Sequence, residues 1–108
     1  KYVEIAIPKQ SHANIITYPP VRVYRFDHQA WREGVEEHRI DGHTVRVYSP
    51  AKTIADCFKF RNKIGVNVAR DAIKTAIAEK RVRPQEIMKY AKICRVSNII
   101  KPILETLI

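Results

Sequence analysis

The chain has few of the residues that mark several common protein classes. Its 108 residues include three glycines, two cysteines and one methionine. Three glycines cannot supply a glycine-rich phosphate-binding loop. Two cysteines far apart, Cys57 and Cys94, do not make a structural zinc site, which needs four ligands. We therefore expect no metal and no cofactor, and we expect two reduced cysteines, buried on the apolar faces of helices, as in a cytoplasmic protein.

Long apolar runs and targeting signals are absent from the sequence as well. No stretch approaches the roughly 20 apolar residues of a membrane span, and no signal-peptide pattern is present. The sequence therefore predicts a cytoplasmic protein with no membrane partner. Its length suits one modest core, and it starts at Lys1 with a strand-like run directly after it. We expect a single domain, residues 1–108, taken from a longer protein.

Acidic residues are scarce in the second half of the chain. Residues 1–50 carry seven lysines and arginines against six acidic residues, a net charge of +1. Residues 51–108 carry thirteen against five, which is +8 of the total of +9. A domain this basic on one side attracts polyanions through phosphate contacts.

The first half shows the alternating pattern of β-strands. Residues 2–7 and 21–26 alternate in polarity, and Asp27 can cap a short helical turn after them. Asp41-Gly42 is a two-residue hairpin turn signal between the runs 35–40 and 43–48. This turn places Ile40 opposite His43 and Glu37 opposite Arg46.

The second half shows helical periodicity, and its clearest segment is residues 47–65, VYSPAKTIADCFKFRNKIG. Ser49 can cap a helix that has Pro50 in its first position, and Gly65 suits the end of that helix. Its buried face would hold Ala51, Ile54, Ala55 and Phe58. Further helices follow, one with Asn67 as a cap, one restarting at Pro84 and one capped by Ser97 or Asn98. The sequence thus predicts an α+β fold, with a small, mainly antiparallel sheet in residues 2–48 and a helical bundle in residues 49–108.

The sequence contains few candidate catalytic residues. His38 and His43 would lie on one hairpin face with Glu36, but nothing close in sequence completes a metal site. A metal-dependent nuclease needs paired carboxylates, and the strand 44–48 has none. We therefore expect no catalytic residues and no enzyme, with a nuclease-like, nucleic-acid-processing enzyme as the alternative.

Basic residues form three clusters that suit contact with nucleic-acid phosphates. The candidate nucleic-acid-binding residues are Lys52, Lys59, Arg61, Lys63, Lys80, Arg81, Arg83, Lys89, Lys92 and Arg95. No helix-turn-helix signature is evident, so these contacts would supplement a separate base-reading element.

Several of these segments together resemble one family. IAIPK, YPPVRVYRF, VEEHRIDGHTVRVYSPAKTIADCFKFRNKIG and MKYAKICRVSNIIKPILETL are similar to the C-terminal domain of AbiEi-type antitoxins, most specifically over residues 45–65. The resemblance implies a bacterial transcriptional regulator in a type IV toxin–antitoxin system, which acts in abortive infection, a viral-defence response.

The resemblance also implies partners. Members of the family usually carry an N-terminal winged helix-turn-helix, which would bind promoter DNA together with this domain and which is missing here. The paired toxin resembles nucleotidyltransferases, and a stable complex with it is not required. A homodimer, or a dimerisation scaffold as the main role, stays open at this stage.

Overall fold

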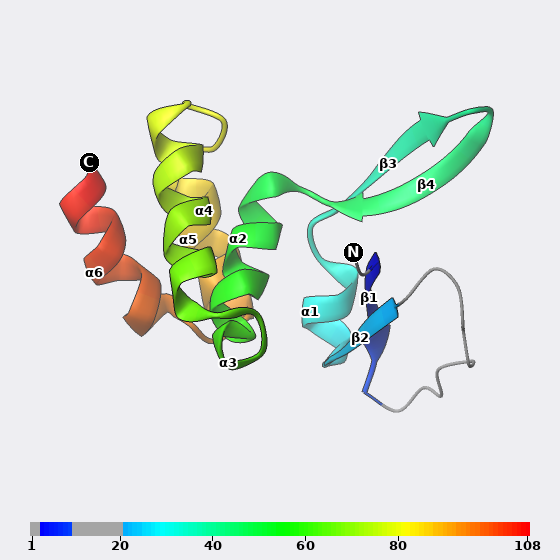
Figure 1. Ribbon diagram of the computed structural model, residues 1–108, viewed down its shortest axis with the longest axis horizontal. Coiled ribbons are helices and arrows are strands. Elements are labelled where there is room, and N and C mark those ends of the chain that lie inside the picture. Colours follow the sequence, from blue (N-terminus) through cyan, green and yellow to red (C-terminus); the bar gives the residue numbers. More distant parts are fainter. Residues whose placement is uncertain (1–2, 10–20) are drawn as a thin grey trace. The chain divides into compact units, whose positions relative to one another are not determined.

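The computed structural model describes residues 3–9 and 21–108 (Figure 1). The α+β class is confirmed. The contacts between residues divide the chain into two compact units, Lys1–Glu33 and Gly34–Ile108. The strands within the described residues form two separate two-stranded sheets, one in each unit, where the sequence predicted one small sheet.

The first unit pairs β1 (Val3–Pro8) with β2 (Val21–Phe26), and α1 (His28–Arg32) contacts both strands. The two strands run parallel, so this sheet departs from the mainly antiparallel expectation. Tyr24, Phe26 and Ala30 are buried. The Trp31 indole donates a hydrogen bond to the Ala6 carbonyl (3.2 Å), which ties the helix to β1.

The second unit begins with a hairpin of β3 (Val35–Ile40) and β4 (His43–Tyr48). Its register is the predicted one, with Ile40 opposite His43 and Glu37 opposite Arg46. The expected ion pair between Glu37 and Arg46 forms at 3.8 Å between exposed side chains. The hairpin extends away from the helices of its own unit (Figure 1), and every residue from Val35 to Val47 is exposed.

The helices of the second unit are α2 (Pro50–Lys59), α3 (Arg61–Ile64), α4 (Val66–Ala78), α5 (Pro84–Ile93) and α6 (Ser97–Leu107). Helix α2 packs against α4, α5 and α6 (Figure 1). Its predicted buried face is confirmed, with Ala51, Ile54, Ala55 and Phe58 all in the core. Ile73, Ile87 and Ile100 face them from the other helices without exposed surface.

Two predicted helix caps are confirmed and two are wrong. The Ser49 hydroxyl accepts a hydrogen bond from the Lys52 amide (3.2 Å), and Asp27 accepts one from the Ala30 amide (2.9 Å). Asn67 is not a cap, because α4 already begins at Val66. Ser97 is the first residue of α6, so neither it nor Asn98 precedes the helix.

The predicted helix over residues 50–64 is interrupted near its end. Phe60, with φ −107° and ψ 27°, leaves helical geometry and separates α2 from α3. The amide of Gly65 then bonds to the Arg61 carbonyl (2.9 Å), and the positive φ of Gly65 (100°) ends α3 as expected. Arg61 and Lys63 therefore lie on a short second helix, whereas Lys59 is the last residue of α2.

Candidate nucleic-acid interface

Lys52 is the one candidate that the structure removes from the surface. Its side chain has no exposed area, although the sequence placed it on the solvent side of α2 with the other lysines. Its Nζ donates to both carboxylate oxygens of Asp56, one turn further along the helix (2.8 and 2.9 Å). The ammonium also lies 4.0 Å from the centre of the Tyr48 ring, a cation–π contact.

The burial of Lys52 corrects the sequence interpretation. A cation near a helix N-terminus opposes the helix dipole, and a buried ammonium needs a counter-ion. Asp56 supplies that charge. Because Lys52 is fully enclosed and ion-paired, it cannot contact a phosphate, and it belongs to the core of the protein instead.

The surroundings of the Lys52–Asp56 pair alter the acidity of three groups. Burial raises the pKa of Asp56, while hydrogen bonds from Lys52 and Cys94 act in the opposite direction. Burial next to Asp56 also raises the pKa of the Cys94 thiol from 9.0 to about 12, and that thiol lies 3.4 Å from the carboxylate. The pKa of Tyr48 is raised by the same two causes. Cys94 is therefore a neutral thiol at neutral pH and a poor nucleophile.

Gly34 allows the chain to cover the Lys52–Asp56 pair closely. Its φ is positive (81°), and a Cβ atom there would lie only 2.6 Å from Cβ of Lys52 and 3.1 Å from the Tyr90 ring. Its carbonyl accepts a hydrogen bond from the Ser49 amide (2.7 Å). The glycine thus lets the base of the hairpin pass directly over α2.

The first basic cluster lies where α2 gives way to α3. Lys59 and Lys63 are exposed, whereas Arg61 is half-buried and donates through Nη1 to the Phe58 carbonyl (2.8 Å). Arg61 therefore satisfies a carbonyl at the end of α2. No acidic residue occurs from Cys57 to Arg70, a stretch with four cations. We call the stretch of residues 57–70 the α3 end.

The second basic cluster lies in the connection between α4 and α5. Lys80, Arg81 and Arg83 are all exposed. Arg81 pairs with Glu79 (3.0 Å), and Arg83 pairs with Glu86 (3.3 Å). These acidic partners reduce the positive potential that the cluster presents to a polyanion.

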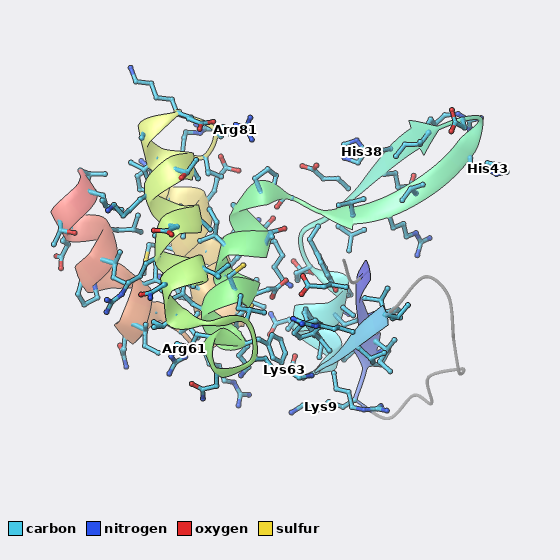
Figure 2. All side chains as sticks on the ribbon, in the orientation of Figure 1. Lys9, His38, His43, Arg61, Lys63 and Arg81 are labelled. Carbon is cyan, nitrogen blue, oxygen red and sulfur yellow. The ribbon has the colours of Figure 1, made fainter. Side chains whose placement is uncertain are left out.

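The two clusters lie at opposite ends of α4. Arg61 and Lys63 precede that helix and Arg81 follows it (Figure 2). A helix of 13 residues separates its ends by about 20 Å. The candidate residues therefore do not form one continuous patch.

The third cluster lies on α5 and continues onto α6. Lys89, Lys92 and Arg95 are exposed, and the first two border a groove of about 770 Å³ with Lys101. Met88, Ile93 and Leu104 also line the groove. Lys101 is not among the candidate residues that the sequence indicated. The spacing of Lys101 from its buried neighbours Ile100 and Leu104 could have placed it on the outer face.

Metal-binding groups do not gather in the region that the structure describes. His38 lies 3.3 Å from Glu36 on the exposed hairpin face, as an isolated pair. Within residues 3–9 and 21–108, no group of three or more histidine, cysteine or acidic residues could hold a metal ion. None of the helices in the same ranges is long and apolar enough to cross a membrane.

No protein-family model and no curated protein matches the chain.

Proposed function

We propose that the chain is a non-catalytic antitoxin and transcriptional-repressor domain of a bacterial type IV toxin–antitoxin phage-defence system, and that it acts in the cytoplasm. The antitoxin part of the proposal is supported by the sequence resemblance. The DNA-binding part is supported by one observation, the net charge of +8 on residues 51–108.

The α3 end is the surface best suited to DNA. Lys59 and Lys63 are exposed there, and no acidic residue occurs between Asp56 and Asp71, the neighbour of Arg70 in α4. Helix α4 starts at this point without an acidic residue in its first turn. The positive end of its dipole therefore adds to the positive potential of the lysines. The α4–α5 connection is weaker, because two of its arginines already have acidic partners.

Contacts of this kind position a protein on DNA without reading its sequence. Lysine and arginine side chains bind phosphates, and the affinity falls steeply with salt as counterions are released. We therefore expect the isolated chain to bind duplex DNA weakly, with little sequence preference.

The test compares two variants that lose equal charge. Lys59→Gln/Lys63→Gln removes two cations from the α3 end, and Lys80→Gln/Arg81→Gln removes two from the other end of α4. Binding to duplexes of unrelated sequence is measured at several salt concentrations. The α3-end variant should lower the slope of log affinity against log salt by up to ~1.8, at ~0.9 per phosphate contact. The control should lower it less. Salt-independent binding, or equal effects of the two variants, would contradict this assignment.

The antitoxin part needs a separate experiment. A nucleotidyltransferase-like toxin encoded beside the gene is expressed with and without this chain, and growth is measured. We expect the chain to restore growth, with no stable complex required. A nuclease assay with Mg²⁺ and Mn²⁺ addresses the enzymatic alternative, and DNA cleavage above that of a mock preparation would overturn the non-catalytic proposal.

A further inference from the structure

The β3–β4 hairpin combines an open backbone edge with an exposed face on which three large apolar residues alternate with Glu36, His38 and His43. Within residues 3–9 and 21–108, β3 has only β4 as a neighbouring strand. On one face Ile40, Val45 and Val47 are 54%, 36% and 47% exposed. A two-stranded ribbon is marginally stable in water, and a third strand or a packed face usually completes it. An open edge is also a template for pairing with another chain.

The turn determines which backbone groups lie on the open edge of β3. Ile40 and His43 flank a two-residue turn, so they are a hydrogen-bonded pair. By alternation, Glu36 and His38 also direct their amides and carbonyls toward β4. Val35, Glu37 and Arg39 therefore direct theirs away from β4, toward the open edge.

The charges on β3 make this edge complementary to itself. In an antiparallel pair of two β3 strands centred on His38, Glu37 of each copy faces Arg39 of the other, twice. A pair centred on Glu37 or on Arg39 would instead set like charges opposite each other, which is destabilising. Strand β4 contains no acidic residue, so its own edge has no such complementarity.

DNA is a poor occupant for the same hairpin. Residues 35–48 carry three acidic residues against two arginines. Their net negative charge disfavours a polyanion. Charge and edge geometry together point to a protein strand.

We propose that β3 is a dimerisation strand that pairs antiparallel with β3 of a second copy, His38 facing His38. The product is a four-stranded sheet with Ile40, Val45 and Val47 of both copies on one face. This inference goes beyond the proposed DNA binding and does not depend on it.

A charge-swap experiment tests the proposed register on the full chain. Glu37→Arg sets two arginines opposite two arginines across the dimer, and Arg39→Glu sets two glutamates opposite two glutamates. Each single variant should raise the dimer dissociation constant about tenfold or more, since two attractive pairs become repulsive. The double variant should restore the dimer. An equimolar mixture of the two single variants should form a heterodimer, because their charges are then complementary.

Sedimentation velocity gives the readout, and far-UV circular dichroism checks that each variant is folded. The equimolar mixture of the two single variants needs no further control, because it contains the same two chains that fail to dimerise when each is alone. Wild-type chain that is monomeric at every concentration would overturn the proposal. Growth beyond a dimer would also overturn it, because that result indicates head-to-tail pairing of β3 with β4.

Disulfide crosslinking provides a second test that tolerates weak dimerisation. Facing residues in a non-hydrogen-bonded antiparallel pair have Cα atoms ~4.5 Å apart, which is within reach of a disulfide. In a Cys57→Ser background, His38→Cys should crosslink on oxidation. Val45→Cys is the matched control, because it would crosslink through the centre of a β4–β4 pair. Crosslinking of the control and not of His38→Cys would overturn the proposal.

Discussion

The helices of the second unit bury several large apolar side chains, whereas its hairpin leaves such side chains exposed. Ile73, Ile87 and Ile100 have no exposed surface in the helices, while Ile40 on the hairpin is 54% exposed. The helices even enclose a lysine, Lys52, completely. The difference shows that burial depends on whether an element has a partner to pack on. The hydrophobic pattern of an element determines only which of its faces would be buried against such a partner.

The largest expected effect contrasts an apolar side chain from each region. Phe58→Ala leaves a cavity in the bundle and should lower the free energy of unfolding by about 3–5 kcal/mol. Ile40→Ala removes an exposed side chain and should change it by less than about 0.5 kcal/mol. Urea denaturation at low protein concentration, where dimers are sparse, measures both. Similar losses for the two variants would mean that the hairpin is packed as tightly as the helices.

Substitutions in the buried Lys52–Asp56 pair test how the helices stabilise a charged side chain in their core. Asp56→Ala leaves the enclosed Lys52 ammonium without its counter-ion and should cost about 3–5 kcal/mol of stability. Lys52→Met/Asp56→Leu removes both charges and should recover most of that loss, since apolar residues of similar volume often replace buried pairs well. A double variant as unstable as Asp56→Ala would show that the pair stabilises the fold through more than mutual neutralisation.

Local signals in the sequence sufficed where neighbours along the chain decide the structure. Asp41-Gly42 determined the hairpin register, because a two-residue turn leaves a single pairing of the strands. Ser49 and Pro50 determined the start of α2, because the cap and the proline both act within one turn. Neither result required knowledge of another element.

Features that depend on distant residues could not be predicted in the same way. Lys52 lies against Gly34 and Tyr48, and its partner Asp56 contacts Cys94. These residues come together only in the folded unit. The spacing of Lys52 and Asp56 predicts an ion pair but gives no information on its exposure.

Gly34 joins the hairpin to the bundle, and its substitution tests that junction. Gly34→Ala places a side chain at positive φ, which costs about 1–2 kcal/mol. The new Cβ would also meet Lys52, and overpacking adds about 1–3 kcal/mol. We expect a total loss of about 2–5 kcal/mol in denaturation experiments. A neutral result would mean that the hairpin base can move away from α2.

Alkaline pH should weaken the bundle through Cys94. Because burial raises the pKa of this thiol from 9.0 to about 12, both states are neutral below pH 9. Between these values the unfolded chain ionises and the folded chain does not, so stability is lost as the pH rises. From pH 8 to 10.5 the thiol accounts for at most about 2 kcal/mol. Cys94→Ala should show a smaller loss over that range, although Tyr48 acts in the same direction in both proteins. Equal losses would contradict the role of the thiol.

The smallest effect concerns two neighbouring cations at the α3 end. Arg61 donates to the Phe58 carbonyl at the end of α2, and Arg61→Gln should lose that bond and about 1–2 kcal/mol of stability, within the range for hydrogen bonds to charged groups. Lys59 is exposed, so Lys59→Gln should change stability by less than about 0.5 kcal/mol. If both residues also contact phosphate, the two variants should reduce the salt dependence of DNA binding equally, despite their unequal effects on folding. Thermal denaturation and salt-dependent DNA titrations of the same preparations separate the two roles. A reduced salt dependence for Lys59→Gln and an unchanged one for Arg61→Gln would indicate that Arg61 serves the fold, and that Lys59 and Lys63 carry the interface without it.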